Sequence, residues 1–370
     1  MKHEKMAVIA TAVFFSLTMG GLAACSGQPA SSGSAESTAI ETEAGTLADE
    51  TDSSRDSASV DHTSGGTYEN SEDGGHAIEA DGVEAAYSNI TVVKTGEADG
   101  DEADFYGENS AVFATNGATL TITEADITTD GTHANAVFSY GEGTTVNISD
   151  STITTSGNCS GGIMTTGGGI TKAYNLTVTT SGGSSAPIRT DRGGGTVTVE
   201  GGTYTSNGLG SPAIYSTADI TVSDAKLISN LSEGVCIEGL NSITLNNCDL
   251  TANNTKCNGN ATFLDTIMIY QSMSGDAASG TSSFTMTGGS LTSKNGHVFH
   301  VTNTSCVITL SGVTITNNDS DNVLISVCDD GWSGGSNIAV LNASKQTLNG
   351  AILVGSNSTL TVSLSDSSSF

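Results

Sequence analysis

The sequence predicts an all-β solenoid, because short strands repeat at a regular interval, turn residues separate them, and a helical period is missing. Each repeat places three apolar residues at positions 0, +2 and +7 of a Thr-rich phrase, as in Leu120, Ile122 and Ile127. A short strand cannot bury its apolar face alone, so we expect rungs roughly 4.8 Å apart to stack over a continuous core. The third apolar position gives the ladder Tyr68, Val92, Ile127, Ile153, Val178, Tyr204, Leu227, Leu250, Leu291 and Ile315.

The spacing of this ladder shows where the repeat is regular and where it is interrupted. Most steps are 23 to 26 residues long, but the step from Val92 to Ile127 is 35 residues and that from Leu250 to Leu291 is 41. The two long steps predict insertions. Glycine ends several turn triplets between strands, and we expect it there because the chain must bend; the triplets are Thr155-Ser156-Gly157, Thr180-Ser181-Gly182, Ser206-Asn207-Gly208 and Lys294-Asn295-Gly296.

A third apolar strand follows the first two in most repeats, as in Ala136-Val137-Phe138, Ala213-Ile214-Tyr215 and Val235-Cys236-Ile237. With this third strand, residues 61–370 resemble the right-handed parallel β-helix proteins of the pectin-lyase-like class, in their bacterial surface, adhesin-like form. The resemblance implies a right-handed parallel β-helix of roughly ten to twelve rungs. Its handedness comes from the family and from the general preference for right-handed crossovers.

Residues 1–25 are predicted to be a lipoprotein signal peptide. Lys2 and Lys5 precede an apolar run over residues 6–22, and Leu22-Ala23-Ala24-Cys25 resembles the bacterial lipobox. The resemblance implies that Cys25 carries a lipid and becomes the mature N-terminus, so that the protein is extracytoplasmic and anchored to the cell membrane. The alternative is an ordinary signal peptide cleaved near an incidental cysteine.

Residues 26–60 are predicted to be a disordered tether. They are rich in Ser, Ala, Gly, Thr and acidic residues and hold few apolar side chains. Such a segment cannot bury enough surface to offset its conformational entropy. We therefore expect it to link the lipid to the solenoid.

The charge of the chain argues against nucleic acid as a partner. The sequence has 40 acidic against 11 basic residues, for a formal net charge of −29. A nucleic-acid-binding surface needs a basic patch, and the sequence offers no basic stripe. The same charge disfavours direct contact of the protein surface with anionic lipid.

The first insertion contains the acidic stretch 97–104, which raises the question of a calcium site, since Ca²⁺ prefers oxygen ligands. The EF-hand pattern fails, because Ala103 and Asp104 stand where a ligand and the required glycine belong. We expect a solvated loop, with a Ca²⁺ site as the alternative, and we predict no other cofactor.

Many proteins of the family that the chain resembles cleave acidic polysaccharides with recognisable catalytic motifs. The hydrolase motifs of polygalacturonases are missing apart from Asp329-Asp330 and a lone Gly296-His297, which come in the wrong order. The best cluster for a lyase is Arg189-Thr190-Asp191-Arg192, where strand alternation would put Arg189 and Asp191 on one face. The simpler interpretation of this cluster is an exposed ion pair at a strand end. No catalytic residue is assigned.

The second insertion and a later loop supply aromatic candidates for ligand binding. Residues 263–270 predict an apolar strand and residues 271–276 a polar loop, so that Tyr270 either lines a groove or is partly buried at a rung edge. Trp332 lies in a Gly-rich loop after Asp329 and Asp330. Its ring would stack on a sugar, and the two carboxylates would accept hydrogen bonds from the hydroxyl groups of that sugar. The alternative is that Trp332 folds over the solenoid as a lid.

The cysteines other than Cys25 are even in number and outside the cytoplasm by the prediction above, so disulfides are permitted and their pairing stays open. The chain stops in mid-pattern near Phe370, and we expect either a truncation or a poorly capped last rung.

A rigid rod on a tether, without recognisable catalytic motifs, predicts a non-catalytic surface protein that acts in adhesion or binds glycans or other surface partners. The first alternative is a polysaccharide lyase or glycoside hydrolase acting on acidic polysaccharide. The second is a passive structural spacer. Arg189, Asp191, Arg192, Tyr270 and the 329–332 loop are the candidate ligand-binding positions.

Overall fold

The computed structural model describes residues 5–7, 61–332 and 335–370. The predicted lipobox with Cys25 and the predicted tether over residues 26–60 lie outside the described residues. In the part of the chain that is described, no helix is long and apolar enough to cross a bilayer.

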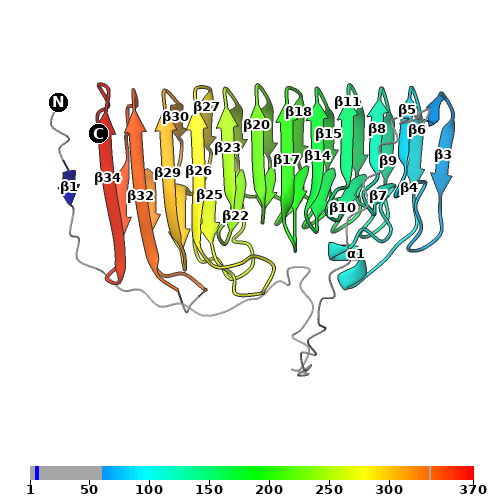
Figure 1. Ribbon diagram of the computed structural model, residues 1–370. Helices are drawn as coiled ribbons and strands as arrows, with labels where there is room; N and C mark the ends of the chain where they lie inside the picture. The colour runs from blue at the N-terminus through cyan, green and yellow to red at the C-terminus, as the bar shows by residue number, and fades with distance from the viewer. Residues whose placement is uncertain (1–4, 8–60, 333–334) are drawn as a thin grey trace, which may run out of the picture.

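The protein is a right-handed parallel β-helix built from three long sheets (Figure 1). Each turn of the chain adds one strand to each sheet, which we call sheets A, B and C in chain order. Within the described residues they contain 13, 10 and 11 strands. Strand β1 (Lys5–Ala7) pairs antiparallel with the last strand of sheet A, which leaves 13 − 1 = 12 parallel strands there. The count agrees with the predicted ten to twelve rungs.

The strands of each sheet are short, and every third strand along the chain belongs to the same sheet until β31, after which sheets C and A alternate. Sheet A continues with β2 (Asp61–Ser64), β5 (Glu84–Ser88), β8 (Thr119–Thr123), β11 (Thr145–Ser149), β14 (Gly169–Tyr174), β17 (Gly195–Glu200), β20 (Asp219–Ser223), β23 (Ser242–Asn246), β26 (Thr281–Thr287), β29 (Ser305–Ser311), β32 (Asn337–Ser344) and β34 (Ser358–Ser365). Sheet B contains β3 (Thr67–Asn70), β6 (Thr91–Lys94), β9 (Asp126–Thr129), β12 (Thr152–Thr155), β15 (Thr177–Thr180), β18 (Thr203–Ser206), β21 (Lys226–Ser229), β24 (Asp249–Ala252), β27 (Ser290–Ser293) and β30 (Thr314–Asn317). Sheet C contains β4 (Ile78–Asp81), β7 (Val112–Thr115), β10 (Val137–Tyr140), β13 (Ile163–Thr166), β16 (Ile188–Thr190), β19 (Ile214–Ser216), β22 (Val235–Glu238), β25 (Asp265–Tyr270), β28 (His297–Thr302), β31 (Val323–Val327) and β33 (Ala351–Val354).

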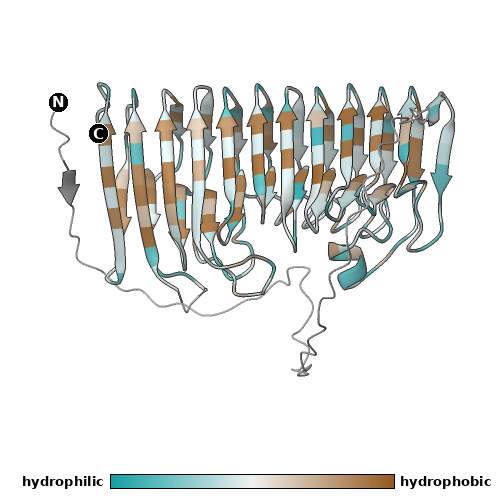
Figure 2. Cartoon of the chain, viewed as in Figure 1, coloured by the Kyte–Doolittle hydropathy of each residue, from teal (hydrophilic) through white to brown (hydrophobic). Residues whose placement is uncertain are grey.

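The register of the sheets confirms the repeat. Leu120 of β8 pairs with Val146 of β11 in sheet A, and Ile127 of β9 pairs with Ile153 of β12 in sheet B. These side chains are fully buried, so equivalent repeat positions stack into one core along the rod. Figure 2 shows the resulting alternation of apolar and polar bands along the sheet A strands. The neighbouring rungs therefore shield one another's apolar faces.

The turn glycines form a column whose role differs from the predicted one. A Cβ atom on Gly182 would lie 1.8 Å from the carbonyl oxygen of Gly157, and one on Gly208 would lie 1.7 Å from that of Gly182. Gly157, Gly182 and Gly208 do not adopt a positive φ, whereas Gly296 does, at +83°. The first three glycines are thus required by the close approach of successive rungs, whereas Gly296 is required both by its left-handed backbone and by the carbonyl oxygen of Leu264, 2.2 Å from where a Cβ would lie.

The two predicted insertions both lie beside sheet C. The second one contains β25 followed by a polar loop, as predicted. The first one is not simply a solvated loop: residues 101–105 form helix α1 (Asp101–Phe105), Asp104 is buried, and its Oδ1 lies 2.9 Å from Nε2 of His133. The hydroxyl of Thr166 donates to the carbonyl oxygen of Phe105 at 2.6 Å and fixes the helix end on sheet C. Helix α1 and the loop after β25 project from the same edge of the rod (Figure 1).

Candidate functional site

A cleft of about 500 Å³ lies on the outer face of sheet C, between helix α1 and the loops near residues 258, 274 and 332. We call it the sheet C cleft. Its lining residues are Phe105, Ser184, Ala186, Arg189, Asp191, Gly210, Pro212, Tyr215, Cys236, Glu238, Asn258, Gly259, Asn260, Met268, Tyr270, Ser272, Ser274, Asp276 and Trp332.

The floor of the cleft follows from strand alternation. Inward positions of sheet C join the core, so the residue after each inward one points outward. The register aligns Arg189 with Tyr215, Tyr215 with Cys236, and Cys236 with Met268 on four successive strands. Polar and aromatic side chains from residues far apart in sequence therefore form one row.

Arg189 and Asp191 lie on one face, as the alternation predicted, but their ion pair is buried rather than exposed. Nη2 and Nε of Arg189 donate to Oδ2 of Asp191 at 2.7 and 3.2 Å, and Nη1 donates to the carbonyl oxygen of Ser184 at 3.3 Å. The two side chains are 10% and 4% exposed. Burial raises the pKa of Asp191 to about 6, although Arg189 opposes the rise.

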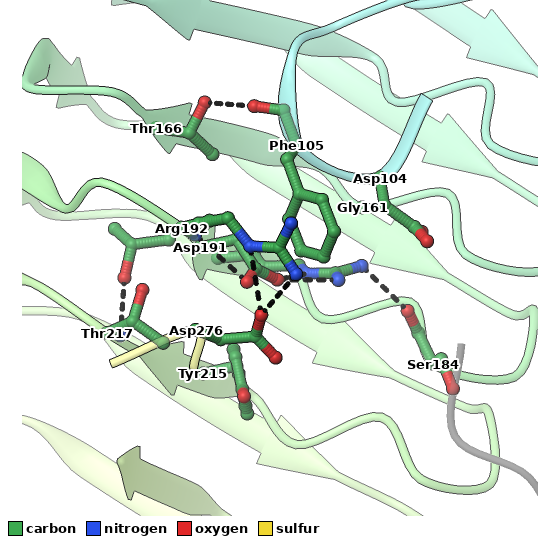
Figure 3. A network of polar contacts seen from close by, with 12 residues as sticks. Asp104, Phe105, Gly161, Thr166, Ser184, Asp191, Arg192, Tyr215, Thr217 and Asp276 are labelled. Carbon is green, nitrogen blue, oxygen red and sulfur yellow. Dashed lines mark hydrogen bonds and ion pairs between the residues drawn. The ribbon is translucent and has the colours of Figure 1, made fainter. Parts of the chain in front are cut away.

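Arg192 joins the two insertions across the cleft edge. Its Nη2 and Nε donate to Oδ1 of Asp276 at 2.8 and 3.1 Å, and Nη1 lies 3.5 Å from Oδ2 of Asp101. The guanidinium also covers the ring of Phe105, 3.7 Å from its centroid. Figure 3 shows Arg192 between Phe105 and Asp276. Helix α1 and the loop after β25, which are separated by most of the solenoid sequence, are thereby held together.

Glu238 is the buried carboxylate at the centre of the cleft wall. The hydroxyl of Tyr215 donates to its Oε2 at 2.8 Å, and the backbone N–H of Ser272 donates to its Oε1 at 3.3 Å. The Ser272 hydroxyl also donates to Oε1. The pKa of Tyr215 is raised well above its ordinary value by burial, then by Tyr270 and Glu238, so the phenol stays a donor.

Tyr270 and Trp332 form the aromatic wall of the cleft. Their ring centroids are 4.8 Å apart at an interplanar angle of 48°. Tyr270 is 8% exposed and Trp332 is 9% exposed, so only a small part of each ring is accessible from the cleft. Trp332 lines the cleft and belongs to the same buried cluster as Met268 and Tyr270, and its stacking on a sugar stays a prediction.

Asp329 and Asp330 do not line the cleft, contrary to the predicted partnership with Trp332. Oδ1 of Asp329 accepts a 2.6 Å hydrogen bond from Nδ2 of Asn337. The Asp330 carboxylate is fully buried, where Nε2 of His300 lies 3.2 Å from its Oδ2 and the backbone N–H of Thr262 donates to its Oδ1 at 2.7 Å. Burial would raise the pKa of Asp330, but the hydrogen bonds from His300 and Thr262 bring it below its ordinary value. Asp330 thus fixes the Trp332 loop to the loop before β25.

One group of potential metal ligands occurs in the described ranges, formed by Asp104, His133 and Cys159 with ligand atoms within 4.8 Å. The pairing of Asp104 with His133 accounts for their proximity without an ion. Calcium therefore stays a prediction.

The cleft residues that were missed in the sequence include Phe105, Tyr215, Glu238 and Asp276. Tyr215 and Glu238 carry a usable signal, because they occupy outward positions of the third strand in a known repeat. Phe105 and Asp276 lie in insertions that have no repeat to place them. Comparison with protein-family models, curated proteins and solved structures found no match, so the function has to be argued from the cleft.

Proposed function

We propose that this protein is a lipid-anchored, extracytoplasmic β-helix protein of the pectin-lyase-like class that binds glycans in the sheet C cleft. The observation that carries the proposal is the composition of the cleft. The aromatic rings of Tyr270 and Trp332 lie beside the hydrogen-bonding groups of Arg189, Asp191 and Glu238. Sugars present apolar ring faces and many hydroxyl groups, so a site that combines aromatic and carboxylate groups matches both.

Glycoside hydrolysis is a second candidate, favoured by one specific feature. Asp191 has a pKa of about 6, so part of the population keeps a proton near neutral pH, as a general acid requires. Glu238 lies on strand β22, two rungs further along sheet C, and is roughly 10 Å away by strand spacing. This spacing is slightly longer than the separation of roughly 6.5–9.5 Å between the carboxyl groups of inverting glycosidases. The ion pair of Asp191 with Arg189 works against proton donation, which places binding ahead of hydrolysis.

The proposal is tested with the purified full-length chain and a panel of neutral, amino and acidic oligosaccharides, by calorimetry and by assay of new reducing or unsaturated ends. We expect binding without new ends. Trp332→Ala should weaken binding about thirtyfold, the effect of removing a central aromatic contact worth about 2 kcal/mol. Tyr174→Ala is the matched control, because Tyr174 is an exposed aromatic residue of sheet A. Equal loss in both variants, or binding to none of the panel, would refute the proposed site.

The lipid anchor is tested separately. We expect Cys25→Ser to move the protein from the membrane fraction to the soluble fraction of the producing bacterium, because the serine hydroxyl cannot replace the thiol that the lipid requires. Metabolic labelling with a fatty acid measures the same step directly. A variant that stays labelled and membrane-bound would contradict the anchor.

A further inference from the structure

The charges of the sheet C cleft narrow the class of glycan that it accepts. The inference rests on the proposed function, since it assigns a ligand class to the same cleft. The charged groups of the cleft differ in whether they already have a partner of opposite charge within the protein. A group without such a partner is available to pair with a charged ligand.

The arginines in the cleft and at its edge already pair with carboxylates of the protein. Arg189 directs Nε and Nη2 at Asp191 and Nη1 at a carbonyl oxygen. Arg192 directs Nε and Nη2 at Asp276 and covers the ring of Phe105. An acidic sugar would have to break one of these pairs to gain a guanidinium partner, and a carboxylate left buried without its cation is costly.

Glu238 is the charged side chain of the cleft that has no partner of opposite charge among the described residues. It is 1% exposed and accepts hydrogen bonds from Tyr215, Ser272 and Ser274, which are neutral donors. Across the residues that the structure describes, the ion pairs leave Glu238 without a Lys, Arg or His partner. A buried carboxylate bordering a cleft without its own counter-charge favours a ligand that supplies one.

The aromatic wall favours the same ligand. Tyr270 aligns with Glu238 on the neighbouring strand, and Trp332 packs against Tyr270. Aromatic rings attract cations through their quadrupole, and the attraction grows where water is excluded. We propose that the sheet C cleft is selective for glycans that carry free, protonated amino groups, with Glu238 as the partner of the ammonium group.

The test compares two oligosaccharides that share one backbone. The full-length chain is titrated with a β-1,4-linked glucosamine hexamer, with its fully N-acetylated counterpart, and with a galacturonate hexamer. We expect the glucosamine hexamer to bind roughly tenfold or more tightly than the acetylated one, the scale of one hydrogen bond to a charged group. The galacturonate hexamer should bind least.

Glu238→Gln keeps the shape of the side chain and removes its charge, so the ratio of the two affinities should fall to near one. Glu200→Gln is the matched control, because Glu200 is an exposed residue of sheet A and its loss should leave the ratio unchanged. If the Glu238→Gln variant fails to fold, the wild-type ratio is measured as pH rises until the glucosamine amines lose their protons. The ratio should then fall to near one, with the acetylated hexamer as reference at each pH.

The outcomes distinguish a failure of the amine selectivity from a failure of the proposed glycan binding. Equal binding of the amino and acetylated hexamers, or tighter binding of galacturonate, overturns the amine selectivity and leaves glycan binding in place. A ratio that survives Glu238→Gln overturns the role of Glu238. Binding of none of the three hexamers overturns both the selectivity and the proposed function.

Discussion

Replacing Arg189 by methionine is expected to lower the free energy of unfolding by about 3–5 kcal/mol at pH 8, because it leaves the buried Asp191 carboxylate without its cation. Methionine keeps most of the apolar stem, so that the change measures mainly the charge. The measurement is urea unfolding followed by circular dichroism.

The effect of Arg189→Met should depend on pH. The folded-state pKa of Asp191, about 6, lies above its ordinary value of 3.8, so its contribution to stability is present below pH 3.8 and is lost as pH rises through 6. Arg189 is the group that opposes this rise, and without it the pKa climbs further. The destabilisation should therefore be largest at pH 8 and shrink at pH 4, where Asp191 is largely protonated in both proteins.

The control is Arg189→Met combined with Asp191→Leu. Removal of both charges leaves no buried ion unpaired, so most of the lost stability should return. A single-variant cost that is the same at pH 4 and pH 8, or a double variant as unstable as the single one, would contradict the buried ion pair.

Gly182→Ala is expected to cost about 3 kcal/mol or more, the upper end of what overpacking usually costs. The added Cβ would lie 1.8 Å from the carbonyl oxygen of Gly157, a backbone atom that cannot rotate away. Neighbouring rungs would have to separate at this corner. Thermal unfolding of the purified chain measures the loss.

Gly117→Ala provides the comparison. A Cβ atom at this position would have no atom within 4 Å. The loss of stability should therefore come from its φ of +79° alone, because a left-handed backbone costs an alanine about 1–2 kcal/mol. Similar losses in the two variants would mean that backbone conformation, and not rung contact, explains the glycine column.

The solenoid was predictable because its repeat can be recognised directly from the spacing of the apolar residues. Leu120 and Val146 occupy the same repeat position and pair in sheet A, and Ile127 and Ile153 do so in sheet B. Local alternation decides which side chains point inward, and the step of 23 to 26 residues decides which strands stack. The face shared by Arg189 and Asp191 was predictable for the same reason.

The cleft was predictable only in part. The Arg189–Asp191 pair, Tyr270 and Trp332 were chosen as separate candidates, and the structure brings them to one cavity. Asp330 was chosen with Trp332 because the two are close in sequence, but its side chain turns to His300 and away from the cleft. Proximity in sequence does not fix direction in a loop without a repeat.

The sequence alone determined the all-β class, the stacking period and the positions of the two insertions, because these follow from local apolar spacing. The tertiary structure decided that both insertions fold against sheet C, that Arg192 joins them through Asp276, and that Glu238 is left without a charged partner in the described chain. It also decided why Gly182 must be glycine. These features depend on contacts between residues 23 to 91 positions apart, where distance and burial are set by the stacked rungs and not by the local pattern.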